Sequence, residues 1–121
     1  MGKVLSGRRI FVAEDEMLVL MDLENMLADL GCESVISAAT VGEALVMVES
    51  LAIDAGILNV NLRGDQKIFV VAEALAARSV PYIFATGYGR ESLIEGYLNR
   101  PLLTKPYRPN ELADKLTQLL Q

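Results

Sequence analysis

Five short apolar runs alternate along this chain with longer segments whose apolar residues recur at helical spacing. The runs cover residues 9–13, 34–38, 55–58, 81–85 and 102–104, and the helical segments cover residues 17–30, 41–51, 67–78, 90–98 and 109 onward. Alternating strands and helices predict a parallel sheet with helices on both faces. Because crossovers between parallel strands are right-handed, we expect an α/β, flavodoxin-like (βα)5 fold, doubly wound, with strand order 2-1-3-4-5.

Local signals mark where two of the predicted helices begin and end. Leu23 and Leu27 belong to one apolar helix face, and Gly31 follows at the place of a C-cap glycine. Thr40 and Glu43 match a capping box, with Thr40 as the N-cap and Glu43 reaching back. These signals support the helix bounds inferred from periodicity.

The composition limits the classes of protein that this chain can be. Its 121 residues suffice for one domain, so we expect a single domain over residues 1–121, in which residues 1–7 form a flexible N-terminal extension. The net charge of −5 argues against a nucleic-acid surface. No run reaches the roughly 18 apolar residues of a membrane helix. The lone Cys32 favours a reducing, cytoplasmic setting, and the lack of histidine means that a metal must be held by oxygen, as Mg²⁺ or Ca²⁺ would be.

Polar residues stand where the predicted strands end. Glu14 and Asp15 follow the first strand, Asn59 the third, Thr86 the fourth and Lys105 the fifth. Each alone has an ordinary explanation: first-turn acids of a helix, a turn residue, a solvated surface charge. The carboxyl ends of parallel strands meet at one edge, however, so we expect these five side chains to converge at a site. Adjacent acids there suit an oxygen-ligated divalent cation.

The segments at these strand ends resemble one protein family. Val12–Glu16, Ile57–Leu62, Ala85–Gly87 and Thr104–Pro106 are similar, in order and spacing, to the receiver domains of two-component response regulators. The resemblance covers essentially the whole chain. Phe84–Tyr88 further resembles a subgroup with a Phe-Ala-Thr-Gly-Tyr signature, often paired with a particular class of bacterial sensor kinases.

The resemblance implies a role for each residue of the site. In that family an aspartate at the end of strand three accepts a phosphoryl group from a kinase phosphohistidine, with Mg²⁺ neutralising the phosphoryl oxygens. The family's phosphoacceptor position is Asn59 in this chain. The metal would be held by Asp15, by Glu14 as the partner acid, at position 59, and by the main-chain carbonyl of Asn61. Thr86 would offer its hydroxyl and Lys105 its ammonium.

Asn59 is the main departure from the family pattern. An amide oxygen is a poor nucleophile, so we expect no phosphorylation at this position, and the missing charge should weaken Mg²⁺ or Ca²⁺ binding. The change is either natural, giving a pseudo-receiver, or engineered, giving an inactive form. We expect no enzymatic activity. A second departure is Leu102, where the family commonly has an aromatic residue; Tyr88 or Tyr97 would be the candidates to replace it.

By the same resemblance, the expected partners are a sensor histidine kinase or phosphotransfer protein and a downstream protein, in a bacterial phosphorelay. The downstream protein would dock on the face formed by helix 90–98, strand 102–104 and the last helix. We expect no direct nucleic-acid or membrane contact. Two alternatives stay open: a phosphorylation-independent interaction module that binds no divalent metal, and a small flavodoxin-like nucleotide-binding enzyme. Against the enzyme, Glu14-Asp15-Glu16 stands where a glycine-rich phosphate loop would be, and it would repel phosphates.

Overall fold

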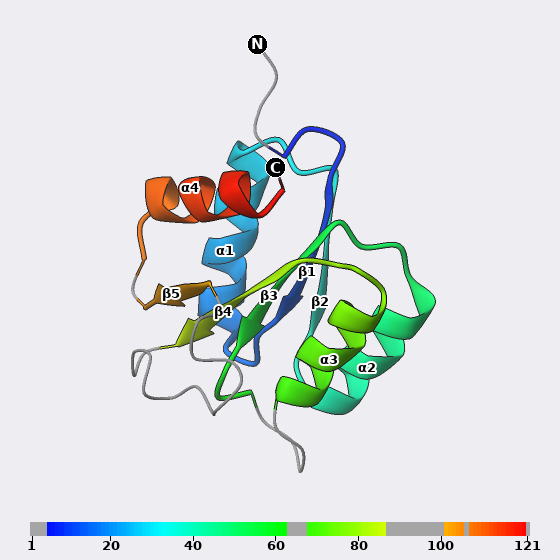
Figure 1. Ribbon diagram of the computed structural model, residues 1–121. Coiled ribbons are helices and arrows are strands. Elements are labelled where there is room, and N and C mark those ends of the chain that lie inside the picture. The colour runs from blue at the N-terminus through cyan, green and yellow to red at the C-terminus, as the bar shows by residue number, and fades with distance from the viewer. Residues whose placement is uncertain (1–4, 63–67, 87–100, 106, 121) are drawn as a thin grey trace.

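The computed structural model describes residues 5–62, 68–86, 101–105 and 107–120 (Figure 1). Within them strand and helix alternate as predicted, except between the fourth and fifth strands, where residues 87–100 are not described. The elements are β1 (Arg9–Ala13), α1 (Met17–Asp29), β2 (Ser34–Ala38), α2 (Val41–Ser50), β3 (Ala55–Asn59), α3 (Phe69–Ala77), β4 (Tyr82–Thr86), β5 (Leu102–Thr104) and α4 (Pro109–Leu119). The helix predicted over residues 90–98 lies outside the described residues.

The five strands form one parallel sheet in the order β2-β1-β3-β4-β5, which confirms the predicted topology. The register pairs Ala13 with Leu58, and Asn59 with Ala85. After β1 the chain adds β2 on one side of it, and then crosses back to add β3, β4 and β5 on the other side. The direction in which strands are added therefore reverses between β1 and β3. In open α/β sheets this reversal marks the edge where ligands bind.

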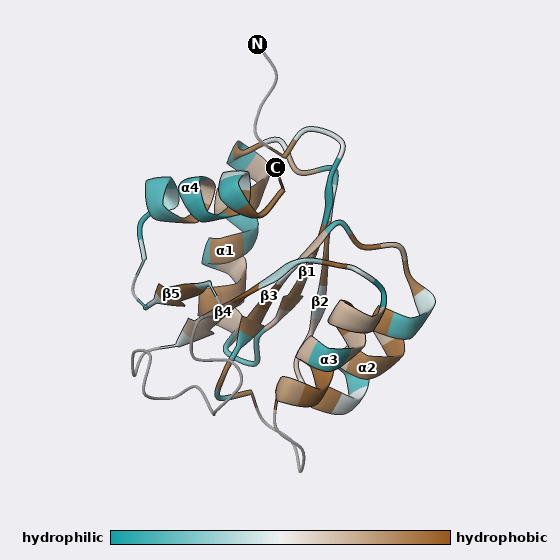
Figure 2. Ribbon diagram, viewed as in Figure 1, coloured by the Kyte–Doolittle hydropathy of each residue, from teal (hydrophilic) through white to brown (hydrophobic). Residues whose placement is uncertain are grey.

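Helices cover both faces of the sheet, with α2 and α3 on one side and α1 and α4 on the other (Figure 1). Two clusters of buried residues match this division: one joins the sheet to α2 and α3, the other joins it to α1 and α4. Figure 2 shows apolar residues along the strands and polar ones on the outward side of α4. A parallel sheet buried on both faces needs such continuously apolar strands.

The capping signals are confirmed, with one difference in detail. Thr40 accepts a hydrogen bond from the backbone N–H of Glu43 at 3.2 Å, and the Glu43 carboxylate reaches back to the N–H of Ala39 at 3.1 Å, one residue before the N-cap. Gly31 has a φ of 90°, the left-handed conformation that favours glycine after a helix C-terminus. The C-terminal end of α1 and the start of α2 are therefore set by local sequence.

Residues 5–7 differ from the flexible extension that was expected over residues 1–7. Leu5 is fully buried among the residues packed under α1 and α4, and its N–H donates to the carbonyl of Leu30 at 2.9 Å. Ser6 forms an isolated antiparallel bridge with Cys32. Residues 5–7 thus pack against the fold, while residues 1–4 lie outside the described part. No helix within the described residues has the length and apolar character needed to span a membrane.

Candidate functional site at the carboxyl edge of the sheet

The predicted site residues all lie at the carboxyl ends of strands. Asn59 is the last residue of β3 and Thr86 the last of β4, so Thr86 belongs to the strand and not to the turn after it. Glu14 extends β1 by donating its N–H to the carbonyl of Ala38, and Lys105 does the same from β5 to the carbonyl of Thr86. The backbone hydrogen bonds of the sheet therefore fix the positions of the Cα atoms of these four residues.

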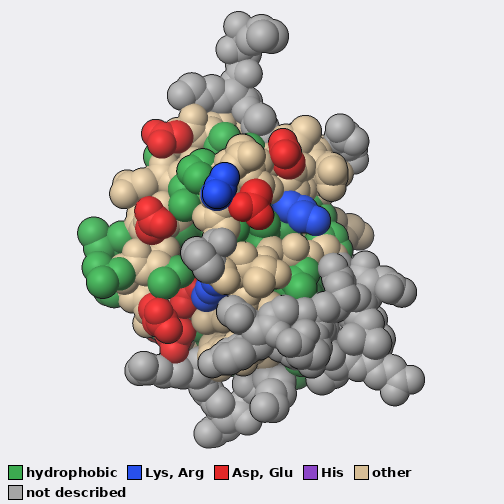
Figure 3. Space-filling view, turned by 90° about the vertical axis from the view of Figure 1, so that its left-hand side faces the viewer, with side chains coloured by type: hydrophobic (Ala, Val, Ile, Leu, Met, Phe, Trp, Pro, Cys, Tyr) green, Lys and Arg blue, Asp and Glu red, His purple; other side chains and the backbone are tan. Residues whose placement is uncertain are grey.

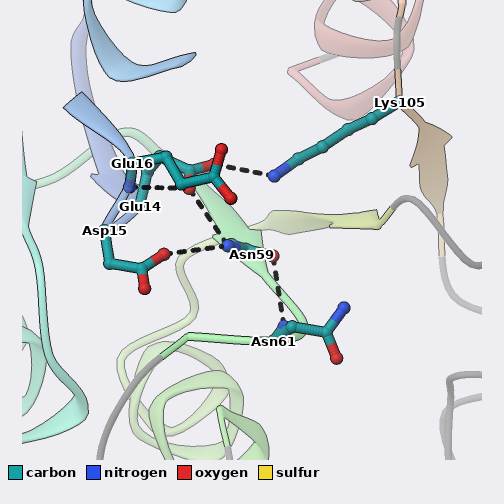
Figure 4. Close-up of polar contacts among 6 residues, drawn as sticks. All are labelled: Glu14, Asp15, Glu16, Asn59, Asn61 and Lys105. Atoms are coloured by element: carbon teal, nitrogen blue, oxygen red, sulfur yellow. Dashed lines mark hydrogen bonds and ion pairs between the residues drawn. The ribbon is translucent and has the colours of Figure 1, made fainter. Parts of the chain in front are cut away.

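Asn59 lies at the centre of the polar contacts (Figure 4). It is only 6% exposed. Its Nδ2 donates to Glu14 Oε2 at 3.1 Å and to Asp15 Oδ1 at 3.4 Å, and its Oδ1 accepts from the N–H of Asn61 at 3.1 Å. The opposite amide orientation would face the oxygen against two carboxylates, so these neighbours determine which way the amide points.

Glu14 is the buried acid of the site, with its side chain 3% exposed. Lys105 Nζ donates to Glu14 Oε1 at 2.8 Å, and the N–H of Glu16 donates to Oε2 at 3.2 Å, in addition to the Asn59 contact. A buried carboxylate is stable only when it is paired and hydrogen-bonded, and the Lys105 ammonium supplies the opposite charge. The sequence predicted Lys105 in the site but not its pairing with Glu14.

Thr86 and Asn61 occupy different positions around this cluster. Thr86 is fully buried at the end of β4, joined to Lys105 through the backbone. Asn61 is exposed and approaches Asn59 through its N–H. The structure thus brings Glu14, Asp15, Asn59 and Lys105 into direct contact, with Asn61 held through its main chain and Thr86 on the neighbouring strand.

The donor groups suit a hard cation in kind but not in their present arrangement. Carboxylate, amide and carbonyl oxygens are the ligands that Mg²⁺ and Ca²⁺ prefer. Yet Asn59 turns its nitrogen towards both acids, and Glu14 is already paired with Lys105. Among the residues that the structure describes, no three His, Cys, Asp or Glu side chains gather as a metal site. The residues therefore fit a divalent cation poorly as they stand.

A groove beside the site was not predicted from the sequence. It has a volume of about 600 Å³ and is lined by Leu18, Val19, Asp22, Leu23, Met26, Lys105 and Tyr107. Burial, and then the charges of Glu14 and Asp22, raise the pKa of Tyr107 to about 12. The only sequence signal for Tyr107 was its place two residues after Lys105. The lining of the groove is mostly apolar, with Asp22, Lys105 and Tyr107 as its polar groups.

The exposed apolar side chains next to this groove are concentrated on α1. Among the described residues, the exposed large apolar side chains are Met17, Leu18 and Met21 on α1 and Val46 on α2, with Leu18 80% exposed. Figure 3 shows the side of the molecule that lies at the left in Figure 1, where acidic and basic side chains are interspersed with hydrophobic ones. The described surface in that view carries no basic stripe.

A doubly wound sheet with this order, and with acids and a lysine meeting at its carboxyl edge, defines a receiver-type regulator. SdrG from Sphingomonas melonis Fr1 is 44% identical over 98% of both chains, with a TM-score of 0.83. The BeF3-activated conformation of SdrG from Pseudomonas melonis Fr1 matches with 43% identity over 100% of both chains and a TM-score of 0.81. The chain belongs to the receiver family of response regulators. No protein-family model matches it.

The chain spans about half the length of the curated relatives that it matches. The transcriptional regulatory protein PdtaR from Mycobacterium tuberculosis is 29% identical over 107 residues, which are 52% of its length. The phyllosphere-induced regulator PhyR from Methylorubrum extorquens is 30% identical over 116 residues, 43% of its length. A receiver domain of the sensor histidine kinase PA1611 from Pseudomonas aeruginosa, solved with magnesium in its active-site cleft, shares the fold at 22% identity over 93% of this chain and 97% of that one, with a TM-score of 0.78.

Proposed function

We propose that this chain is a single receiver domain, residues 1–121, that regulates its partners through protein contacts without being phosphorylated at position 59. The observation that carries the proposal is the buried amide of Asn59 at the end of β3, where the family has its acceptor aspartate. The remaining polar residues at the same edge, Asp15, Thr86 and Lys105, match the family pattern. This combination is that of a pseudo-receiver, natural or engineered, and sequencing the encoding gene distinguishes the two origins.

The chemistry of the amide explains why phosphoryl transfer stops here. In the family, a carboxylate oxygen attacks phosphorus, forming an O–P bond as the N–P bond to the kinase histidine breaks. Asn59 Oδ1 carries no formal charge, its lone pairs are less nucleophilic than those of a carboxylate, and it accepts the N–H of Asn61 at 3.1 Å. The acyl phosphate that the family forms is therefore not available to this chain.

The roles of the other residues follow from the same comparison. Lys105 would stabilise negative charge at the sheet edge, and Thr86 would offer its hydroxyl from the adjacent strand. Glu14, Asp15 and the carbonyl of Asn61 are the groups that would hold Mg²⁺ or Ca²⁺, with an affinity lowered by Asn59. The Phe84–Tyr88 segment supports a place for the chain in the Phe-Ala-Thr-Gly-Tyr subgroup of receivers; Gly87 and Tyr88 lie outside the described residues.

The proposed partners are a sensor histidine kinase or phosphotransfer protein and a downstream protein in a bacterial cytoplasm. The predicted docking face includes residues 90–98, which lie outside the described part. Within the described part, Met17, Leu18 and Met21 of α1 expose apolar area beside the groove at Lys105 and Tyr107. Exposed apolar patches of this kind mark protein contacts, so α1 is a second candidate surface for a partner.

The proposal can be tested with beryllofluoride, since SdrG has a BeF3-activated conformation. We expect the ¹H–¹⁵N NMR spectrum of the wild-type chain in Mg²⁺ to stay unchanged when BeF3⁻ is then added. The Asn59→Asp variant should instead show saturable shifts at the amides of Asn61, Thr86 and Lys105. Saturable shifts of the same amides in the wild type on addition of BeF3⁻, beyond those caused by Mg²⁺ alone, would contradict the proposal.

A further inference from the structure

We infer that Asn59 and Lys105 together replace the divalent cation at this site, so that the acid pair Glu14 and Asp15 is held in place without metal. The inference rests on the proposed function, because it assumes that the chain functions with asparagine at position 59 and is not phosphorylated there. It goes further by assigning a structural role to the amide: it bridges the acids in addition to being unable to accept a phosphoryl group.

The contacts of Glu14 are the first line of support. This side chain is 3% exposed, and both of its oxygens have donors: Lys105 Nζ at 2.8 Å on Oε1, and Asn59 Nδ2 at 3.1 Å and the N–H of Glu16 at 3.2 Å on Oε2. The donors come from three separate parts of the chain. A cation that approached Glu14 would have to displace an ammonium group already paired with it in a mostly buried position.

The contacts of Asn59 are the second line of support. The amide nitrogen has two hydrogens to donate, and it donates to both acids, to Glu14 at 3.1 Å and to Asp15 at 3.4 Å. The amide oxygen points the other way and accepts from the N–H of Asn61. To place its oxygen beside the acids as a metal ligand, the amide group would have to rotate by about 180°. That turn would break all three hydrogen bonds and leave buried polar groups unpaired, which is costly.

The charge balance of the cluster is the third line of support. Glu14, Asp15 and Lys105 carry two negative charges and one positive charge, so the cluster has a net charge of −1. An aspartate at position 59 would bring the net charge to −2 and place three carboxylates at one strand edge. Like charges so close raise one another's free energy, and a cation relieves that repulsion. With asparagine there is less repulsion to relieve, so the acid pair does not need the cation.

The test compares thermal unfolding in EDTA, in about 10 mM MgCl₂, and in NaCl of equal ionic strength. For the wild type we expect the Tm to change by less than about 1 °C between Mg²⁺ and the NaCl control. For Asn59→Asp we expect a lower Tm in EDTA than the wild type has, and a rise of about 3–6 °C with Mg²⁺. Far-ultraviolet circular dichroism checks that the variant is folded.

Asn59→Ala separates the amide bridge from the charge at this position. It removes the donors to both acids without adding a carboxylate, so its Tm should fall below that of the wild type in NaCl. A wild-type Tm that rises with Mg²⁺ as much as that of Asn59→Asp would overturn the inference, as would an Asn59→Ala Tm equal to that of the wild type.

The two proposals fail in different ways. A wild-type chain that binds Mg²⁺ in a saturable manner, seen at the amides of Asp15 and Asn61, but ignores BeF3⁻ would contradict metal replacement and leave the proposed function standing. A wild-type chain that responds to BeF3⁻ would contradict the proposed function itself.

Discussion

At the scale of single residues, Glu14 decides how the acidic edge of the sheet is stabilised. A carboxylate that is 3% exposed must be compensated, and Lys105, 22% exposed, reaches it at 2.8 Å from the far end of the chain. Removing one partner of a buried ion pair leaves an uncompensated charge, whereas surface pairs contribute little. Lys105 therefore contributes to the stability of the fold.

We predict that Lys105→Met lowers the free energy of unfolding by about 2–3 kcal/mol, somewhat less than for a fully buried pair because water can reach Glu14 beside the missing ammonium. Urea unfolding measures this change. The control is Lys115→Met on α4, since Lys115 makes no ion pair within the described residues and should change stability by less than about 0.5 kcal/mol. An equal decrease in the free energy of unfolding for the two variants would show that the Glu14–Lys105 ion pair does not stabilise the fold.

Tyr107 provides a prediction about alkaline pH. Burial, with the charges of Glu14 and Asp22, raises its pKa to about 12, above the ordinary value of 10.0. Because the folded pKa lies above the unfolded one, the neutral phenol stabilises the fold fully below about pH 10, and this contribution is lost as the pH rises towards about 12. Tyr107→Phe should weaken the fall of Tm over that range. An identical fall in both proteins would refute the assignment.

At the scale of elements, β3 is shaped by close packing against α3. A Cβ added at Gly56 would lie 2.9 Å from Leu75 Cδ1 and 3.6 Å from Tyr82 Cβ. Leu75 is fully buried and cannot move aside without disturbing the cluster around it. The glycine thus lets β3, the strand that carries Asn59, lie close to the helix that covers it.

We predict that Gly56→Ala destabilises the protein by about 1–3 kcal/mol, because it overpacks the interface between β3 and α3. Gly42→Ala is the matched control: a Cβ there meets nothing within 4 Å, and alanine should stabilise α2 by up to about 1 kcal/mol. Urea unfolding of both variants gives the sign of each effect. A neutral Gly56→Ala would mean that Leu75 yields more easily than its burial indicates.

Several elements were predictable from the sequence for a physical reason. The bounds of β1, β2 and β5 were predicted, since short β-branched apolar runs bounded by polar residues indicate strands. β4 was predicted one residue too early at both ends, because Thr86 looks like a turn residue beside Gly87, and β3 was predicted to end at Leu58, one residue before Asn59. Strand order followed from the alternation of elements and the handedness of crossovers.

At the scale of the whole molecule, the N-terminal segment adds a buried side chain to the cluster between the sheet and helices α1 and α4. Leu5 joins the cluster that holds Leu27 and Leu116, although no periodic pattern marks it in the sequence. A leucine in the short segment Lys3-Val4-Leu5-Ser6 gives no local signal of burial, because its partners come from distant elements. The same limit applies to the direction of the Asn59 amide and to the Glu14–Lys105 pair.

We predict that Leu5→Ala lowers the free energy of unfolding by about 2–4 kcal/mol through loss of buried apolar volume. Ser6→Ala, next in the chain and exposed, should change it by less than about 0.5 kcal/mol. If Leu5→Ala were as mild as Ser6→Ala, residues 5–7 would behave as the extension expected from the sequence.

The central claim is that a receiver fold with an amide at position 59 cannot take up a phosphoryl group. Intact-mass spectrometry after incubation with acetyl phosphate and Mg²⁺ measures this directly, with Asn59→Asp as the matched positive control. We expect the wild-type chain to keep its mass and Asn59→Asp to gain one phosphoryl group that is labile at alkaline pH. A stable adduct localised to Asn59 in the wild type, or an Asn59→Asp chain that stays unmodified, would contradict the claim.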